Sequence, residues 1–142
     1  MKFEQSFDTF ACEGDSIQLS HGGLTFTARI ERDEDSNIDD DDVHNPNQDV
    51  TGCDAEQQTK LLEARRAWLA DEWFYCGITI EVSLDGNTIL DGAASLWGIE
   101  CNYPESDNSY LNQIANELLV EAVECAKAKI ESLQIALNQI SL

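Results

Sequence analysis

Positively charged residues are scarce in this chain. Only eight of its 142 residues are lysine or arginine, against 28 aspartates and glutamates, so the formal net charge at pH 7 is −20. A surface with this charge repels nucleic acid and anionic membranes, and it attracts basic partners at a rate that falls as salt rises. The composition therefore disfavours direct nucleic-acid or membrane binding and favours a basic partner.

Paired cysteine motifs and long apolar runs are also missing. The five cysteines show no C-x-x-C spacing, which argues against a disulfide framework and a zinc ribbon. Reduced thiols are typical of the cytosol. No apolar segment approaches the ~20 residues that span a bilayer, and no signal-peptide pattern opens the sequence. We therefore expect a cytoplasmic protein.

The apolar patterns predict one α+β domain over residues 1–142. Gly22-Gly23 and Asp85-Gly86 each separate two alternating segments and predict two β-hairpins, with a bulge or an early bend at Asp91-Gly92. The four expected strands cover residues 16–21, 24–30, 74–84 and 89–99. Residues 1–15 are expected to form an arm or short strand that packs through its phenylalanines.

Two helices complete the expected fold. Asp54, with Gln57 three residues later, predicts a capping box for a helix that runs to about Asp71. A second helix is expected over residues 109–140 with Ser109 as its cap, and at 1.5 Å per residue it is roughly 45–50 Å long. The predicted architecture is an antiparallel four-stranded sheet in ββαββα order, with both helices packed on one face and a long C-terminal helix that overhangs the core.

Residues 31–53 are expected to form an acidic, mobile loop, because acids dominate this segment and Asn45, Pro46 and Gly52 interrupt it. Glutamates also fall along the outward side of the predicted C-terminal helix, at i,i+4 distances of about 6 Å. That distance resembles the separation of phosphates along a nucleic-acid strand. The predicted phosphate-mimicking, partner-binding residues are Asp33, Glu34, Asp35, Asp39, Asp40, Asp41, Asp42, Glu56, Glu63, Asp71, Glu72, Glu117, Glu121, Glu124 and Glu131.

An apolar seam follows the other side of the same helix. Its residues alternate in steps of four and three, which is a heptad pattern. Because an apolar overhang needs a partner, and a second copy supplies the same helix, the seam favours a homodimer. The alternative is that the helix folds back on the sheet or frays at its end. The expected dimerisation residues are Leu119, Val123, Ala126, Ile130, Leu133, Leu137 and Ile140.

Short motifs in the second half of the chain resemble a known group of proteins. They are W-F-Y-C-G-I at residues 73–78, A-S-L-W-G-I-E at residues 94–100, Y-L at 110–111 and A-N-E-L at 115–118. This pattern is similar to small acidic proteins of bacteriophages and other mobile elements, mostly uncharacterised. The resemblance implies that the protein acts in the cytoplasm of a host cell and that it has a role in the contest between a mobile element and its host.

The sequence leads to one main hypothesis and two alternatives. The main hypothesis is a non-enzymatic decoy that imitates nucleic acid and inhibits a host defence protein, of anti-CRISPR or anti-restriction type, with no cofactor, metal or catalytic residue. One alternative is a structural or adaptor protein that dimerises through its C-terminal helix. The other is a weak cation-binding module, because Asp33-x-Asp35-x-Asn37 matches the start of an EF-hand loop, although Ile38 and His44 break the rest of that motif.

Overall fold

The computed structural model describes residues 1–41, 43–44 and 52–142. The α+β class and the long C-terminal helix are confirmed, and one short 3-10 turn is added to the expected element order. The strands are β1 (Ser16–His21), β2 (Leu24–Arg32), β3 (Phe74–Leu84) and β4 (Asn87–Cys101). The helical elements are η1 (Ile38–Asp40), α1 (Ala55–Leu69) and α2 (Ser109–Asn138).

The four strands form one antiparallel sheet in the order β1-β2-β3-β4. Both predicted hairpins are confirmed, and so is the irregularity at Asp91-Gly92, since the register shifts between the pairs Ile80–Ala94 and Val82–Leu90. A second shift near Trp97 was not predicted. There the Trp97 ring lies so close to Gly77 that a Cβ atom at Gly77 would be only 2.2 Å from Cε3 of Trp97.

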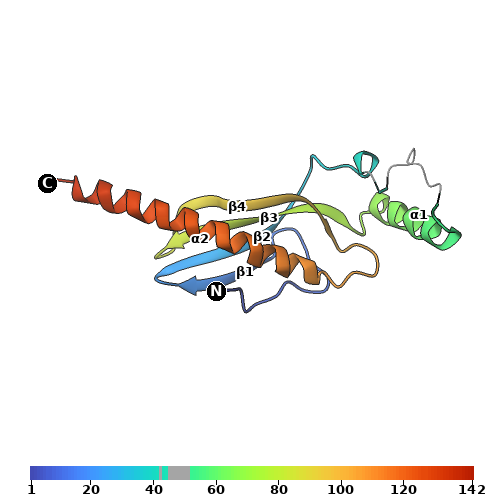
Figure 1. Cartoon of the computed structure of the whole chain (residues 1–142), viewed down its shortest axis with the longest axis horizontal. Helices are drawn as coiled ribbons and strands as arrows, with labels where there is room; N and C mark the ends of the chain where they lie inside the picture. The colour runs from blue at the N-terminus through green and yellow to red at the C-terminus, as the bar shows by residue number, and fades with distance from the viewer. Residues whose placement is uncertain (42, 45–51) are drawn as a thin grey trace.

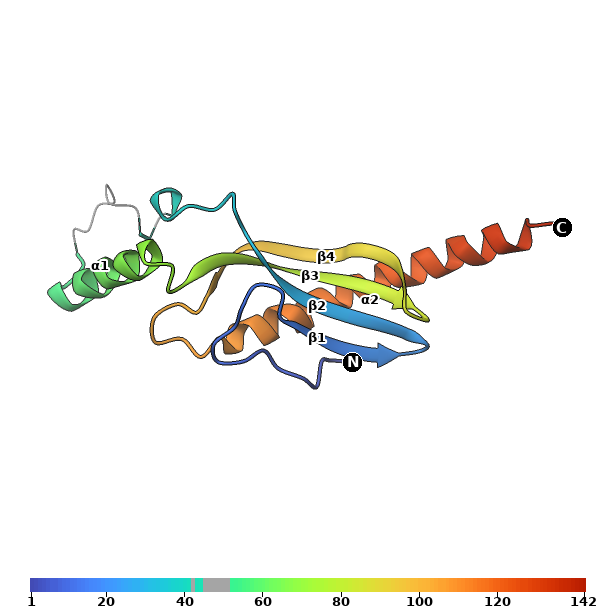
Figure 2. The ribbon, with the colours of Figure 1, turned by 180° about the vertical axis from the view of Figure 1, so that it is seen from behind.

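The main core lies between the sheet and α2. Alternate residues of β3, such as Ile78, Ile80 and Val82, are fully buried and face this core. Helix α2 crosses β3 and β4 and contributes Leu111, Leu119 and other residues. Within the described residues, neither α1 nor α2 lies over the opposite face of the sheet (Figure 2), which is covered at one end, where Ile38 of η1 clusters with Tyr75. The long helix therefore covers one side of the sheet only.

The prediction that both helices pack on one face is wrong for α1. This helix lies beyond the end of the sheet where β2 ends and β3 begins (Figure 1). The reason is that α1 offers little apolar surface: Leu62 and Leu69 are exposed, and its fully buried residues are Ala64 and Ala67. It therefore packs on a small second cluster with Trp73 instead of covering the sheet.

The N-terminal arm is held by three asparagine side chains. The backbone N–H groups of residues 3, 7 and 11 donate to the side-chain oxygens of Asn116, Asn112 and Asn102, each at 2.8 Å. Phe3 and Phe7 are buried in the core. The expected packing of the arm through its phenylalanines is thus confirmed for these two, whereas Phe10 is exposed.

Both helix starts were predicted, one with the right cap. Asp54 and Gln57 form the expected capping box. At α2 the cap position is Asn108 rather than Ser109, and its side chain makes no cap hydrogen bond. The fully buried Asn108 instead donates to the Thr9 carbonyl and to Asn102 Oδ1. Its polar groups are therefore needed to join the arm to the loop before α2.

The far end of α2 projects beyond the sheet, as predicted (Figure 1). Ile135, Leu137 and Ile140 are 56%, 64% and 61% exposed. Among the described residues, none of the helices combines the length and apolar character that a membrane crossing requires. The two ends of the molecule thus differ, with α1 at one and the α2 overhang at the other.

Candidate partner-binding surface

The acidic segment after β2 is fixed to the sheet by Asp33. Its Oδ1 accepts hydrogen bonds from the backbone N–H groups of Asp35 and Ser36, at 3.0 and 3.2 Å. Its Oδ2 accepts from the Ser36 hydroxyl at 2.8 Å and from the N–H of Gly98 on β4 at 2.9 Å. Burial acts to raise the pKa of Asp33, but these hydrogen bonds outweigh it and hold the pKa below its usual value.

Further along, His44 joins three segments of the chain. Its Nδ1 lies 3.0 Å from Asp41 Oδ2 and its Nε2 lies 2.8 Å from the Tyr103 hydroxyl. The Tyr75 hydroxyl also donates to Asp41 Oδ2, at 2.7 Å. The imidazole is only 2% exposed. Because Tyr75 lies on β3 and Tyr103 follows β4, these contacts tie the acidic segment to the sheet.

This cluster holds two carboxyl groups in different electrostatic states. Burial acts to raise the pKa of Asp41, but hydrogen bonds from Tyr75 and His44 reverse the effect and keep it below its usual value. Burial also raises the pKa of Glu100; nearby His44 opposes this and the Asp41 carboxylate adds to it. The cluster therefore stabilises a negative charge on Asp41 and penalises one on Glu100.

Helix α1 and η1 pack around the aromatic part of the same cluster. The Trp73 ring lies 5.1 Å from the rings of both Tyr75 and Tyr103, edge to face, and its Nε1 donates to the Ala64 carbonyl at 2.7 Å. A salt bridge of 2.7 Å joins Arg65 to Asp39. These contacts place the acidic residues of η1 beside α1.

Many of the predicted phosphate-mimicking residues already have partners within the chain. Asp33 and Asp41 are engaged as described above, and Asp42 lies outside the described residues. Ion pairs engage six more of them: Asp39, Glu56, Glu63, Asp71, Glu72 and Glu124. These carboxylates are less available to a partner than their number in the sequence implies.

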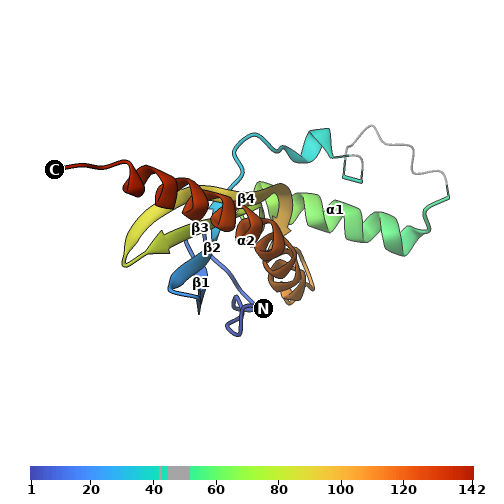
Figure 3. The ribbon, with the colours of Figure 1, turned by 60° about the vertical axis from the view of Figure 1, so that its left-hand side comes forward.

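The remaining predicted acids are exposed and fall into two groups. In the described part of the chain, no lysine, arginine or histidine pairs with them. The first group, Glu34, Asp35 and Asp40, lies at the α1 end of the molecule. The second group, Glu117, Glu121 and Glu131, shares the outward face of α2 with Glu124. Figure 3 shows η1 and the middle of α2 on different parts of the molecule, so the carboxylates form two patches rather than one track.

The few cations are largely neutralised inside the chain. Six of the eight lysine and arginine side chains form ion pairs with its own carboxylates: Arg29, Arg32, Lys60, Arg65, Arg66 and Lys127. Arg66, for example, bridges Glu63 and Glu72 at 2.6 and 2.7 Å. The surplus of negative charge therefore stays at the surface, where a basic partner can reach it.

Asp41, His44 and Glu100 are also the residues that could hold a metal ion. One ligand atom from each lies within 4.8 Å of the other two, and histidine with carboxylates is a donor set that suits zinc and similar divalent ions. The EF-hand-like residues are used differently. Asp33 is occupied by the contacts described above, and Asn37 Oδ1 accepts from the Asp39 N–H at the start of η1.

Sequence reasoning missed this cluster because its members are far apart in the chain. His44 and Glu100 are separated by a helix and a hairpin, so no local spacing connects them. One feature of the sequence could have indicated the cluster. Tyr75 lies on the face of β3 opposite the main core, and it follows Trp73 in a short segment rich in aromatic residues. Such a stretch at a strand start indicates a second packing surface.

The predicted dimerisation seam is divided between two environments. Leu119 and Ala126 are buried in the chain's own core, and Val123 packs against it. Ile130 and Leu133 are half-buried, while Leu137 and Ile140 are exposed on the overhang. Only the last part of the seam is therefore open to a partner.

Comparison of the chain with family models, with curated proteins and with solved structures gave no match. Likeness to known proteins therefore adds nothing to the functional assignment.

Proposed function

We propose that this chain is a non-catalytic acidic decoy that binds the basic nucleic-acid groove of a host defence protein in the cytoplasm. A CRISPR effector or a restriction enzyme is the type of target proposed, because the sequence resemblance implies a role in the contest between a mobile element and its host. One observation supports the proposal most directly: Glu117, Glu121 and Glu131 are exposed along one face of α2, and none of them forms an ion pair within the described part of the chain.

The mechanism is competition for a basic surface. Carboxylates at i,i+4 positions lie about 6 Å apart on the helix, so α2 presents negative charge at intervals that a phosphate-binding groove accepts. Binding releases counterions, as nucleic-acid binding does. Arginines in the groove bind carboxylates through two parallel hydrogen bonds. The second patch, at Glu34, Asp35 and Asp40, adds charge at the other end.

The test is binding to purified CRISPR effectors and restriction enzymes, with their nucleic acid as competitor. We expect the affinity to fall steeply from low to high salt and the nucleic acid to displace the chain. Binding that is insensitive to salt, or a ternary complex with nucleic acid, would contradict the proposal.

Two triple variants can distinguish whether the position of the carboxylates or the total charge of the chain determines the affinity for the partner. Glu117→Gln, Glu121→Gln and Glu124→Gln remove three charges from the α2 face and should weaken binding. Glu4→Gln, Asp8→Asn and Asp91→Asn remove three exposed charges elsewhere and serve as the matched control. Equal loss of affinity in both variants would mean that bulk charge alone, rather than a patterned face, determines binding.

A second candidate function is divalent-cation binding. The observation in its favour is the meeting of Asp41, His44 and Glu100, because a bound cation would offset the cost of two neighbouring carboxyl groups that include the half-buried Glu100. A cation at this place would also brace the acidic segment against β4. The two functions are compatible, since Asp40 of the acidic patch is exposed and is not one of the three residues that could bind the cation.

A further inference from the structure

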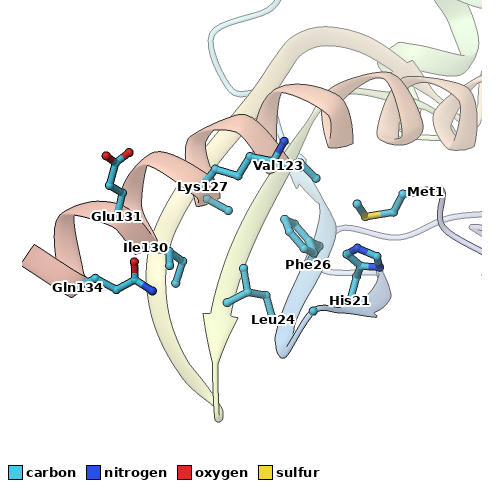
Figure 4. Close-up of a pocket in the computed structure, with 11 residues that line it drawn as sticks. Met1, His21, Leu24, Phe26, Val123, Lys127, Ile130, Glu131 and Gln134 are labelled. Carbon is cyan, nitrogen blue, oxygen red and sulfur yellow. The ribbon is translucent and has the colours of Figure 1, made fainter.

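The overhang of α2 continues directly into an apolar groove on the same molecule. The groove has a volume of about 480 Å³ and lies between α2 and the β1–β2 hairpin. Figure 4 shows Leu24 and Phe26 on the hairpin side, with Val123 and Ile130 on the helix side. Val123, Ala126 and Ile130 belong to the same heptad seam as the overhang residues. Each chain thus has both an apolar groove and an exposed apolar helix end, the α2 overhang.

The charge of the chain changes sign along α2. Residues 105–124 contain five acids and no base, whereas residues 125–142 contain two lysines and one glutamate, which gives 2 − 1 = +1. In a protein of net charge −20, this segment is the part that a second copy approaches with least repulsion. Charge and apolar exposure therefore single out the same end of the molecule.

We infer that the occupant of the groove is a second copy of this chain, whose α2 lies antiparallel to the first. In an antiparallel heptad pair, the two seam positions face each other. Ile130 then meets Leu133 of the other copy, and Leu137 and Ile140 of each overhang reach the groove beside the other copy's Val123. The seam residues that are open on each copy therefore face apolar side chains in this register.

The antiparallel direction is also the one that keeps charge apart. It places the two acidic bodies at opposite ends of the paired helices, whereas a parallel pair would bring two bodies of net charge −20 side by side. It is also the direction in which the tip of one overhang reaches the groove of the other copy. A two-fold axis near residues 131 and 132 relates the two helices, which makes the interface self-complementary.

The first test is the mass of the full chain in solution, by light scattering after gel filtration. We expect a mass near twice 15.8 kDa for the parent and a single-chain mass for Leu137→Asp. Val120→Asp is the matched control, because it adds the same charge to an exposed position of α2 outside the seam, and it should remain dimeric. Circular dichroism confirms that each variant is folded. A parent that stays at 15.8 kDa at high concentration, or loss of the dimer in the control alone, overturns the inference.

A second test fixes the direction of the helices. In the antiparallel register, Lys127 of one copy lies beside Gln134 of the other, flanking the seam. The double variant Lys127→Cys with Gln134→Cys should form an interchain disulfide under mild oxidation, well above the level seen in either single variant. Equal cross-linking in the single variants would overturn the antiparallel direction. These outcomes do not involve the acidic face, so failure here is distinct from failure of the decoy function.

Discussion

The Nε2 atom of His44 lies 2.8 Å from the hydroxyl oxygen of Tyr103. Burial raises the pKa of Tyr103, so its hydroxyl keeps its proton at neutral pH. The other ring nitrogen of His44, Nδ1, lies 3.0 Å from Asp41 Oδ2. The hydrogen bonds of His44 with Asp41 and Tyr103, together with that of Tyr75 with Asp41, therefore join the acidic segment to the sheet and to the loop after β4.

Tyr103→Phe should therefore destabilise the fold. The substitution leaves a buried ring nitrogen without its partner, which costs about 1–3 kcal/mol in the free energy of unfolding. Tyr110→Phe is the control, because the buried Tyr110 hydroxyl has no hydrogen-bond partner among the described residues, and its removal should leave stability unchanged or raised. Urea titration of both variants measures the difference; equal losses would contradict the assigned role.

Glu100→Gln should stabilise the protein at neutral pH. Burial raises the pKa of Glu100 above its unfolded value, so the ionised form costs stability at high pH and the cost vanishes once both states are protonated. The gain in melting temperature should therefore be present at pH 7, shrink as the pH falls through the raised pKa of the folded state, and be gone below about 4, where the unfolded glutamate is protonated as well. A gain that persists in acid would mean that something other than charge is responsible. Glu105→Gln, at an exposed position, should show no such profile.

Asp33→Asn should destabilise the protein more than Asp35→Asn. The Asp33 carboxylate accepts four hydrogen bonds, and an amide nitrogen cannot accept those at Oδ2. We expect a loss of about 1–3 kcal/mol, measured by chemical unfolding at pH 7. Because the pKa of Asp33 is lowered on folding, its stabilisation is present above the unfolded value of ~3.9 and is lost as the pH falls through the folded value. Parent and variant should thus converge in acid.

Zinc should raise the melting temperature of the parent if Asp41, His44 and Glu100 bind it, because a ligand that binds only the folded state stabilises it. His44→Ala should abolish this shift. His21→Ala is a matched control, since His21 is exposed at the other end of the sheet, and it should respond as the parent does. No shift in the parent, or an equal shift in the His44 variant, would remove the metal site as a candidate function.

Gly77→Ala should displace Trp97. The added methyl group would lie 2.2 Å from the indole ring, so the ring has to leave its place over the strand, at a cost of about 1–3 kcal/mol. Tryptophan fluorescence should report the movement. In a Trp97→Ala background, the same substitution should cost much less, and a double-mutant cycle measures this coupling. Additive effects would show that the two residues do not interact.

The hairpins and both helices could be predicted because their signals are local. Gly22-Gly23, Asp85-Gly86 and the Asp54–Gln57 capping box each act within a few residues. The place of α1 could not be predicted, because it depends on a cluster formed with Trp73 and Tyr75 across the chain. The same limit applies to the site: counting acids identified the exposed glutamates of α2, but it could not tell that Asp33 and Asp41 hold structure together.

The asparagine-held arm has a consequence for the edges of the sheet. β1 is an edge strand, and unpaired edge groups invite strands from other molecules. The N–H of Gln18 on this strand donates to the Gln5 side chain of the arm at 2.8 Å, so a backbone group that could start such pairing is already used. Because hydrogen bonds hold the arm in place at residues 3, 7 and 11, the arm protects the edge of β1 from pairing with strands of other molecules.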